Sequence, residues 1–321
     1  MKRILLFLFL ILTFTKDTLP CNICGGGTGE LVVLALDGRA LFNAGIFYDS
    51  YRGVWDQYGT YRESQYTKNQ YRTSLSGAYR FDKHWQFAIT IPYIVNFENV
   101  PGLKNHSSSI GDIVFSGRYE FFHEYQLKKK NNKNYIDATL PYLAVTFGLT
   151  MPTGRSEESA ENDVDVTGKG FFMSSLGVSL TKSLIKNKLQ VSMDFSWQHC
   201  FKKTYEKYFG QTLSTPFVKQ QGDKFNYDVM FNYIFSSWHA VSFSVAGYSQ
   251  TPYSINDIRT DLSDERNINF TLMYTYYPTV KFRITPQIKW NLPINNIGKN
   301  APGSTTFGLN LTYYIEDYNI K

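Results

Sequence analysis

The 321-residue chain has only three cysteines, and this scarcity excludes several kinds of site. A structural zinc ion needs about four ligands, which Cys21, Cys24 and Cys200 cannot supply alone. Attachment of c-type haem requires a histidine directly after a Cys-x-x-Cys motif, whereas Gly25 follows Cys24. We therefore expect no metal site and no cofactor.

Long apolar segments are missing beyond the first residues. Met1–Arg3 is basic and residues 4–14 are apolar, a combination typical of a cleavable export signal. No later run approaches the roughly 18 apolar residues of a transmembrane helix. A mature chain that lies in a membrane must therefore cross it as a closed β-barrel, because lipid offers no partners for unpaired backbone groups.

Charge is also limited, at 19% of residues with a net charge of +6. No run of Lys and Arg is interleaved with aromatic residues, so we expect no nucleic-acid partner. The mean hydropathy of -0.30 is too polar for a helical membrane protein. A barrel escapes this objection, because only every second residue of its strands faces lipid.

Apolar and polar side chains alternate along the chain with a period of two, which places them on opposite faces of a sheet. The clearest segment is 280–292, although Pro286 within it predicts a local bulge. Eleven comparable segments lie at 40–51, 70–81, 85–95, 112–122, 140–151, 171–181, 189–198, 224–235, 239–249, 267–277 and 304–315. Each has about the length of a tilted membrane-spanning strand. The sequence therefore predicts an all-β fold, a transmembrane antiparallel up-and-down β-barrel of about 12 strands.

Short turns alternate with long polar loops between these segments. The long loops are 52–69, 97–111, 152–170, 201–223 and 250–267. Bacterial barrels keep short turns in the periplasm and long loops outside the cell. The exception is 123–139, a long connection on the periplasmic side that contains Lys128–Lys130 and is interpreted as a solvated charge run. We therefore divide the chain into a signal peptide (1–20), a periplasmic Cys/Gly-rich leader (21–39) and an outer-membrane barrel (40–321), with outer-membrane lipids as partners and the oligomeric state left open.

Three short motifs resemble those of a known family. They are Ile91-Pro92-Tyr93 after one strand, Ile110-Gly111-Asp112-Ile113 before the next, and Met151-Pro152-Thr153-Gly154 after the third. Their order and spacing resemble the MetA-pathway phenol-degradation family of outer-membrane proteins, from about Tyr71 to Ile315. The resemblance implies a barrel that transports small molecules, and it does not establish phenol as the substrate.

The leader contains Cys21 and Cys24, which we treat as candidates for a disulfide or, at Cys21, for lipidation. Transient metal or redox binding remains an alternative. The glycine-rich stretch 25–29 lacks the Gly-Lys-Ser/Thr ending of a phosphate-binding loop, so we interpret it as a flexible leader.

The polar faces of the predicted strands carry charged residues that should line the lumen. They are Arg72, Arg80, Arg118, Glu120, Asp194, Asp228, Lys281, Arg283 and Lys289. Barrel closure should bring the cations of 70–81 and 280–292 into one sector, with the two aspartates roughly opposite and Glu120 paired with Arg118. A net anion preference and an affinity for small carboxylates or phenolates would follow, unless the charges simply fill the lumen with ion pairs.

The sequence thus predicts a channel or transporter for small hydrophobic or anionic solutes, and not an enzyme. One alternative is a lipid-acting enzyme, for which His106 and Ser107–Ser109 are the only candidates with His beside Ser. A structural surface barrel is another, and a soluble β-sandwich is a third. Carboxylates at Glu157, Glu158, Glu161, Asp163 and Asp165 could bind Ca²⁺, but they lack EF-hand spacing, and an acidic solvent-exposed loop is the simpler interpretation.

Overall fold

The computed structural model describes residues 38–82, 84–99, 106–121, 127–130, 133–136, 140–185 and 188–316. The predicted signal peptide and almost all of the leader, including Cys21 and Cys24, lie outside these residues. Within the described residues, no helix is long and apolar enough to cross a membrane.

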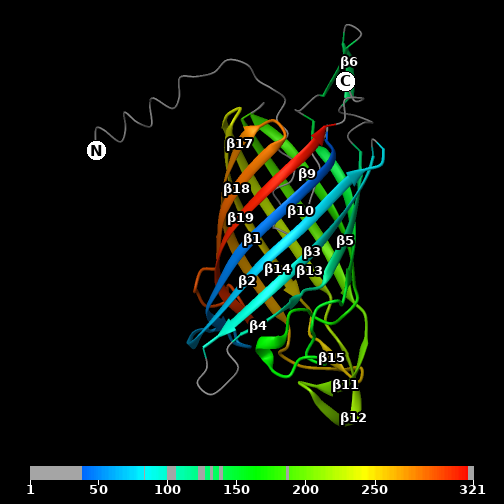
Figure 1. The fold of residues 1–321 in the computed structure, drawn as a ribbon, viewed down its shortest axis with the longest axis vertical. Coiled ribbons are helices and arrows are strands. Elements are labelled where there is room, and N and C mark those ends of the chain that lie inside the picture. The colour runs from blue at the N-terminus through cyan, green and yellow to red at the C-terminus, as the bar shows by residue number, and fades with distance from the viewer. Residues whose placement is uncertain are drawn as a thin grey trace, which may run out of the picture.

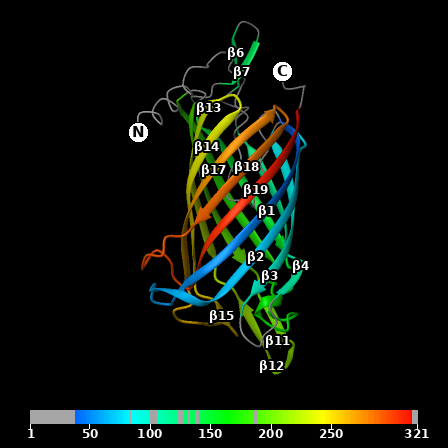
Figure 2. The same cartoon turned by 60° about the vertical axis from the view of Figure 1, so that its left-hand side comes forward.

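The strands form a closed antiparallel barrel, which confirms the predicted fold class (Figures 1 and 2). In chain order around the wall they are β1 (Gly38–Trp55), β2 (Tyr61–Arg80), β3 (Trp85–Glu98), β5 (Ile113–Glu120), β8 (Tyr142–Met151), β9 (Met173–Ile185), β10 (Leu189–Cys200), β13 (Lys224–Ser236), β14 (His239–Gln250), β17 (Glu265–Thr279), β18 (Phe282–Trp290) and β19 (Ala301–Glu316). Each strand pairs with its neighbour in this order, and β19 pairs with β1 to close the ring. Short β4 (His106–Ile110) continues the line of β5 along β3.

The alternation seen in the sequence becomes an inverted burial pattern, with polar side chains inside and apolar side chains outside. On β10, Phe195 is 51% exposed on the outer face, whereas on neighbouring β9 Ser179 is 3% exposed on the inner face. The same pattern holds around the wall, where Leu176, Phe231, Phe243, Leu272, Phe307 and Leu311 are exposed and Ser76, Thr90, Asn232, Ser244, Thr271 and Thr306 are buried. Such an outer face is stable in lipid and not in water, and it excludes the soluble β-sandwich.

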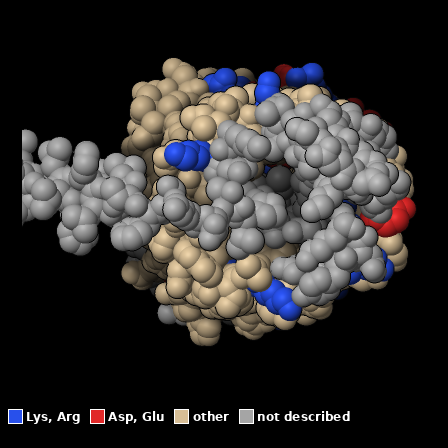
Figure 3. Space-filling view, turned by 90° about the horizontal axis from the view of Figure 1, so that it is seen from above, with Lys and Arg blue, Asp and Glu red and all other residues tan. Residues whose placement is uncertain are grey.

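The two ends of the barrel differ in their connections. Turns of two residues join β13 to β14 and β17 to β18, at the end where β1 begins and β19 ends. We call this the short-turn end and the other the long-loop end. The connection between β5 and β8 lies at the short-turn end, as predicted, and contains the hairpin β6 (Leu127–Lys130) and β7 (Lys133–Ile136) (Figure 2). Figure 3 looks onto this end, where the visible basic side chains of the described residues lie at separate points around the rim.

Several segments predicted to be loops are folded into strands. β1 and β2 continue past the wall as a hairpin, so that the predicted loop 52–69 shrinks to a turn at residues 56–60. Asp56 closes this turn, because its Oδ1 accepts hydrogen bonds from the backbone N–H groups of Tyr58 (2.9 Å) and Thr60 (3.0 Å). Local side-chain acceptors of this kind favour a tight turn.

The two loops after β10 and β14 form a second sheet. Its strands are β11 (Lys203–Tyr208), β12 (Gln211–Gln220), β15 (Ser254–Ile255) and β16 (Ile258–Arg259), paired in that order. We call this sheet the cap, and it projects from the long-loop end of the barrel (Figure 1). The loop 152–170 stays largely irregular, with one short 3-10 helix, η1 (Asp163–Asp165).

Pro286 does not produce the predicted bulge. The register between β17 and β18 is the same before and after it, with Met273 opposite Gln287 and Tyr276 opposite Ile284. Pro286 itself lies opposite Leu309 of β19, within an unbroken register. The irregularity lies instead between Tyr276 and Thr279, next to the turn.

Candidate functional site in the barrel lumen

A closed ion cluster lies inside the barrel at its short-turn end. Glu120 is fully buried. Its carboxylate oxygens form ion pairs with Nη1 of Arg80 at 2.5 Å and with Nε of Arg118 at 3.4 Å. Gln86 donates its amide to the same carboxylate, and Arg80 also donates to the backbone oxygen of Gly38. The predicted pairing of Glu120 with Arg118 is confirmed, and Arg80 is a second partner that sequence spacing alone did not reveal.

Four of the other predicted lumen residues are partly exposed on the inner wall. Arg72 lies over the ring of Phe47 at 5.1 Å and 3.9 Å from Asp49. The other three are Asp194, Arg283 and Lys289. The ring order places β18 three strands from β2, so these cations do share one sector of the wall, while β10 lies across the barrel from β1.

The remaining two predicted residues occupy different surroundings. Asp228 of β13 is buried and lies directly opposite Asp194 in the pairing with β10, so the two aspartates are neighbours, as the predicted acidic side of the lumen requires. Lys281 lies in the turn before β18 and not on the strand predicted for it, because β17 extends to Thr279 and leaves only two residues for the turn. Its backbone oxygen accepts a hydrogen bond from Tyr314 at 2.7 Å.

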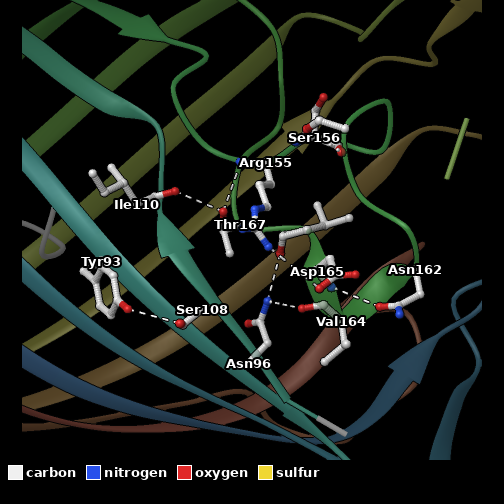
Figure 4. A network of polar contacts seen from close by, with 12 residues as sticks. Tyr93, Asn96, Ser108, Ile110, Arg155, Ser156, Asn162, Val164, Asp165 and Thr167 are labelled. Atoms are coloured by element: carbon white, nitrogen blue, oxygen red, sulfur yellow. Dashed lines mark hydrogen bonds and ion pairs between the residues drawn. The ribbon is translucent and has the colours of Figure 1, made fainter. Parts of the chain in front are cut away.

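At the long-loop end, residues 152–170 fold inward across the mouth of the barrel, and we call them the inserted loop. Asn96 on the inner face of β3 is 3% exposed and donates two hydrogen bonds of 2.9 Å, to the backbone oxygens of Val164 and Val166 (Figure 4). Lys68 of β2 holds Asp163 of the same segment at 2.5 Å. These contacts fix the tip of the loop against the β2–β3 wall.

The base of the inserted loop is fastened by one carboxylate. Asp112 accepts hydrogen bonds from the backbone N–H groups of Gly154 at 3.0 Å and Lys169 at 2.7 Å, which are the two ends of the loop. The backbones meet closely there, since a Cβ on Gly154 would lie 2.7 Å from the Cα of Gly168. Glycine is therefore required at this crossing by space alone.

The three motifs that carry the family resemblance meet at this point. The N–H of Gly111 donates to the oxygen of Pro92 at 2.9 Å. The hydroxyl of Thr153 donates to the oxygen of Gly111 at 2.8 Å, and the N–H of Ile113 donates to that hydroxyl at 3.0 Å. The sequence identified the motifs but not their common role at the base of the loop. It also did not identify Asn96 as a contact of the loop, because a strand pattern does not indicate which loop will fold inward.

Four of the five acidic residues of the inserted loop lie beside basic partners, Asp163 through the contact with Lys68 described above. Glu157 pairs with Lys219 at 2.9 Å and Glu158 with Lys203 at 3.0 Å, which ties the loop to the cap. Asp165 lies 4.0 Å from Arg155. Among the described residues no group of three or more acidic, His or Cys side chains could hold a metal ion, so the structure gives no support to a Ca²⁺ site here.

The pKa of Glu158 reflects these contacts. Partial burial raises this pKa, but the hydrogen bond from Lys203 and the backbone N–H of Glu206 outweigh burial and hold the pKa below its ordinary value. Glu158 is therefore ionised at neutral pH, as its ion pair with Lys203 requires.

The residues weighed for an enzyme lie on β4, which was predicted as a loop. His106 stacks on Phe97 with ring centroids 6.5 Å apart, and the hydroxyl of Ser108 accepts a hydrogen bond from Tyr93 at 3.1 Å. Tyr93, Phe97 and His106 all lie on the outer face. The hydroxyl of Ser108 therefore has Tyr93 as a hydrogen-bond partner, and the ring of His106 packs against Phe97.

The barrel shares its fold with an outer membrane channel from Pseudomonas putida F1. The TM-score is 0.70 at 14% sequence identity, and the match covers 91% of this chain and 100% of that one. Weaker likenesses include the NanC porin (TM-score 0.45, 12% identity, 85% of this chain and 100% of that one) and the translocator domain of the autotransporter NalP from Neisseria meningitidis (TM-score 0.46, 8% identity, 86% and 88%). No protein-family model and no curated protein matches the sequence.

Proposed function

We propose that this chain is an outer-membrane channel for small solutes with a preference for anions. The observation that carries the proposal is the sign of the partly exposed charges among the predicted lumen residues. Of the predicted lumen residues on strands, those that are partly exposed comprise three cations, Arg72, Arg283 and Lys289, and one carboxylate, Asp194. The charges of the ion cluster around Glu120 are closed off from the lumen, so they contribute less to the field that a solute meets.

We infer an outer-membrane location from the apolar outer face together with the predicted export signal. The exposed apolar band requires lipid, and barrels of this type are a solution for exported proteins that carry no spanning helix. Orientation follows from the connections, with the short-turn end in the periplasm and the inserted loop and cap outside the cell. The fold shared with the Pseudomonas putida channel supports this location.

The anion preference has a simple electrostatic origin. A confined passage between low-dielectric walls strengthens the field of each charge over its value at an open surface. Rows of charge of one sign then select ions of the other sign.

Reversal potentials in planar bilayers under a potassium chloride gradient test the proposal. We expect chloride to be favoured over potassium, and we expect Arg283→Glu combined with Lys289→Glu to reverse that preference. Lys182→Glu is the matched control, since Lys182 is exposed at the short-turn end of β9 and should leave the reversal potential unchanged. A cation-selective native channel, or a double variant that behaves like the native protein, would contradict the assignment.

Membership of the phenol-degradation family remains part of this proposal. The support for it is the convergence of the three motifs at the base of the inserted loop, where each contributes a specific hydrogen bond. Substitution of Asp112 by Ala should release that loop, and a channel of unchanged conductance would argue against a shared functional role for the motifs.

A further inference from the structure

The inner face of β18 carries polar and basic side chains in regular order. Arg283, Thr285, Gln287 and Lys289 point inward in succession, and all four are partly exposed. Alternate residues of a strand lie about 7 Å apart, so the two cations stand about 20 Å apart along the strand. Two neutral hydrogen-bonding side chains fill the interval between them.

The neighbouring strands extend this neutral surface. On β19, Asn310 lies directly opposite Thr285, and Thr312 lies opposite Arg283. On β17, Thr275 accepts a hydrogen bond of 3.4 Å from the hydroxyl of Thr285. Hydroxyl and amide groups therefore surround the middle of β18 on both sides.

Arg283 is held by an aromatic ring. Its guanidinium lies 5.1 Å from the ring centroid of Tyr314, and its buried Nε has no hydrogen-bond partner. Stacking fixes the plane of the guanidinium, and Tyr277 is a further side-chain partner of Arg283. A guanidinium oriented in this way can bind a planar carboxylate through more than one N–H group.

We propose that the inner face of β18 is a binding track for small hydroxylated carboxylates, a specificity that rests on the channel function proposed above. Lys289 meets the carboxylate near the outer mouth and Arg283 receives it near the periplasm. Thr285 and Gln287 exchange hydrogen bonds with the hydroxyl groups of the solute between these two cations.

The hydroxyl groups of the solute matter because an aliphatic solute would leave the polar side chains of β18 without hydrogen-bond partners. An alkyl chain that passes Thr285 and Gln287 displaces water from them and returns no hydrogen bond, and unsatisfied polar groups are costly. A site that hydrogen-bonds a hydroxyl rejects an analogue without it more strongly than an apolar site rejects an added hydroxyl. The track thus favours the anionic over the hydrophobic class of solute.

Three six-carbon probes separate the contributions. Gluconate carries both a carboxylate and hydroxyls, hexanoate carries only the carboxylate, and sorbitol carries only hydroxyls. The measurement is the concentration at which each probe half-blocks the chloride current through native protein in a planar bilayer. One hydrogen bond contributes roughly 1 kcal/mol, or about fivefold in affinity. We expect gluconate to block at least about tenfold more tightly than either other probe, since it makes several such bonds.

Two chemically identical substitutions locate the effect on β18. Gln287→Leu should weaken block by gluconate about fivefold, equivalent to one hydrogen bond, and leave block by hexanoate unchanged. Gln190→Leu on β10 makes the same change across the barrel and should alter neither. The heat-dependent shift of the folded barrel on a denaturing gel confirms that each variant is folded.

The outcomes are distinguishable. Hexanoate that blocks as tightly as gluconate, or equal effects of the two glutamine substitutions, would overturn the β18 track and leave the anion channel standing. Failure of the native protein to conduct any salt would overturn the channel function itself.

Discussion

Carboxylates pair with basic side chains at both ends of the barrel, but the pair at one end is buried and the pair at the other is partly exposed. At the short-turn end, Arg80 and Glu120 are 2.5 Å apart with side chains 1% and 0% exposed. At the long-loop end, Lys203 and Glu158 are 3.0 Å apart with side chains 24% and 27% exposed. Breaking a buried pair leaves an uncompensated charge and costs about 3 to 5 kcal/mol, whereas an exposed pair contributes about 0 to 1 kcal/mol. The buried cluster therefore maintains the barrel, and the exposed pairs position the cap.

The largest effect is expected where the buried cluster is broken. Glu120→Gln leaves Arg80 and Arg118 without their carboxylate and should lower the free energy of unfolding by about 3 to 5 kcal/mol. Denaturant unfolding in lipid vesicles, followed by tryptophan fluorescence, measures it. Glu158→Gln is the matched control and should cost at most about 1 kcal/mol. Equal losses in the two variants would remove the contrast between the two ends.

A charge introduced on the outer face gives a second loss of stability with which the loss in Glu120→Gln can be compared. Phe195→Arg places a cation in lipid and should destabilise the inserted barrel by about 2 to 4 kcal/mol. The adjacent Ser196 faces the lumen, where its hydroxyl lies 3.3 Å from the amide of Asn226, so Ser196→Arg should be tolerated better. Equal tolerance at the two positions, in the same unfolding measurement, would show that the inner and outer faces have been assigned wrongly.

The tip of the inserted loop is held in part by neutral hydrogen bonds from Asn96, which lie between these two classes in strength. Asn96→Ala removes both of these bonds and leaves the pair of Lys68 with Asp163, so it should cost about 1 to 3 kcal/mol and should raise single-channel conductance if the loop limits flow. Asn226→Ala changes another inward amide that does not contact the loop, and its conductance should stay near the native value. Unchanged conductance in Asn96→Ala would mean that the loop does not limit flow.

The smallest effect concerns pH and the cap. The pKa of Glu158 is lowered in the folded protein, so its stabilising contribution is fully present above the ordinary carboxyl pKa and is lost as pH falls through the folded value. Because the pair is partly exposed, the loss should stay under about 1 kcal/mol. The protection of β11 amides against hydrogen exchange, relative to their intrinsic rate at each pH, should fall below about pH 4 in the native protein. In the control Glu158→Gln this protection should be low at every pH, and a native profile that is flat down to acid pH would contradict this role.

The wall of the barrel could be predicted because its signal is local. Each strand shows its two faces through a period of two, and Phe195 beside Ser196 already indicates lipid on one side and lumen on the other. The pairing of Glu120 with Arg118 was equally local. Arg80 as a partner of Glu120 was not, because the contact depends on the register between β2, β3 and β5.

The loops resisted prediction for the opposite reason. Composition described 152–170 as a polar, acidic segment, yet its fold depends on Asn96 and Asp112, which lie about forty or more residues earlier in the chain. The predicted loops at 201–223 and 250–267 pair with each other as the cap, through β12 and β15. Contacts of this range leave no periodicity in the sequence.

The sequence by itself determined that one face of each strand is apolar and the other polar, and hence that the chain closes into a membrane barrel of predictable strand number. Only the tertiary structure decided which charges are closed off and which remain open to the lumen. Burial of a charge depends on what the register places beside it: Glu120 lies between two arginines, while Arg283 meets the ring of Tyr314. The alternation of apolar and polar side chains is a property of adjacent residues, whereas the pairing of charges depends on which strands lie side by side.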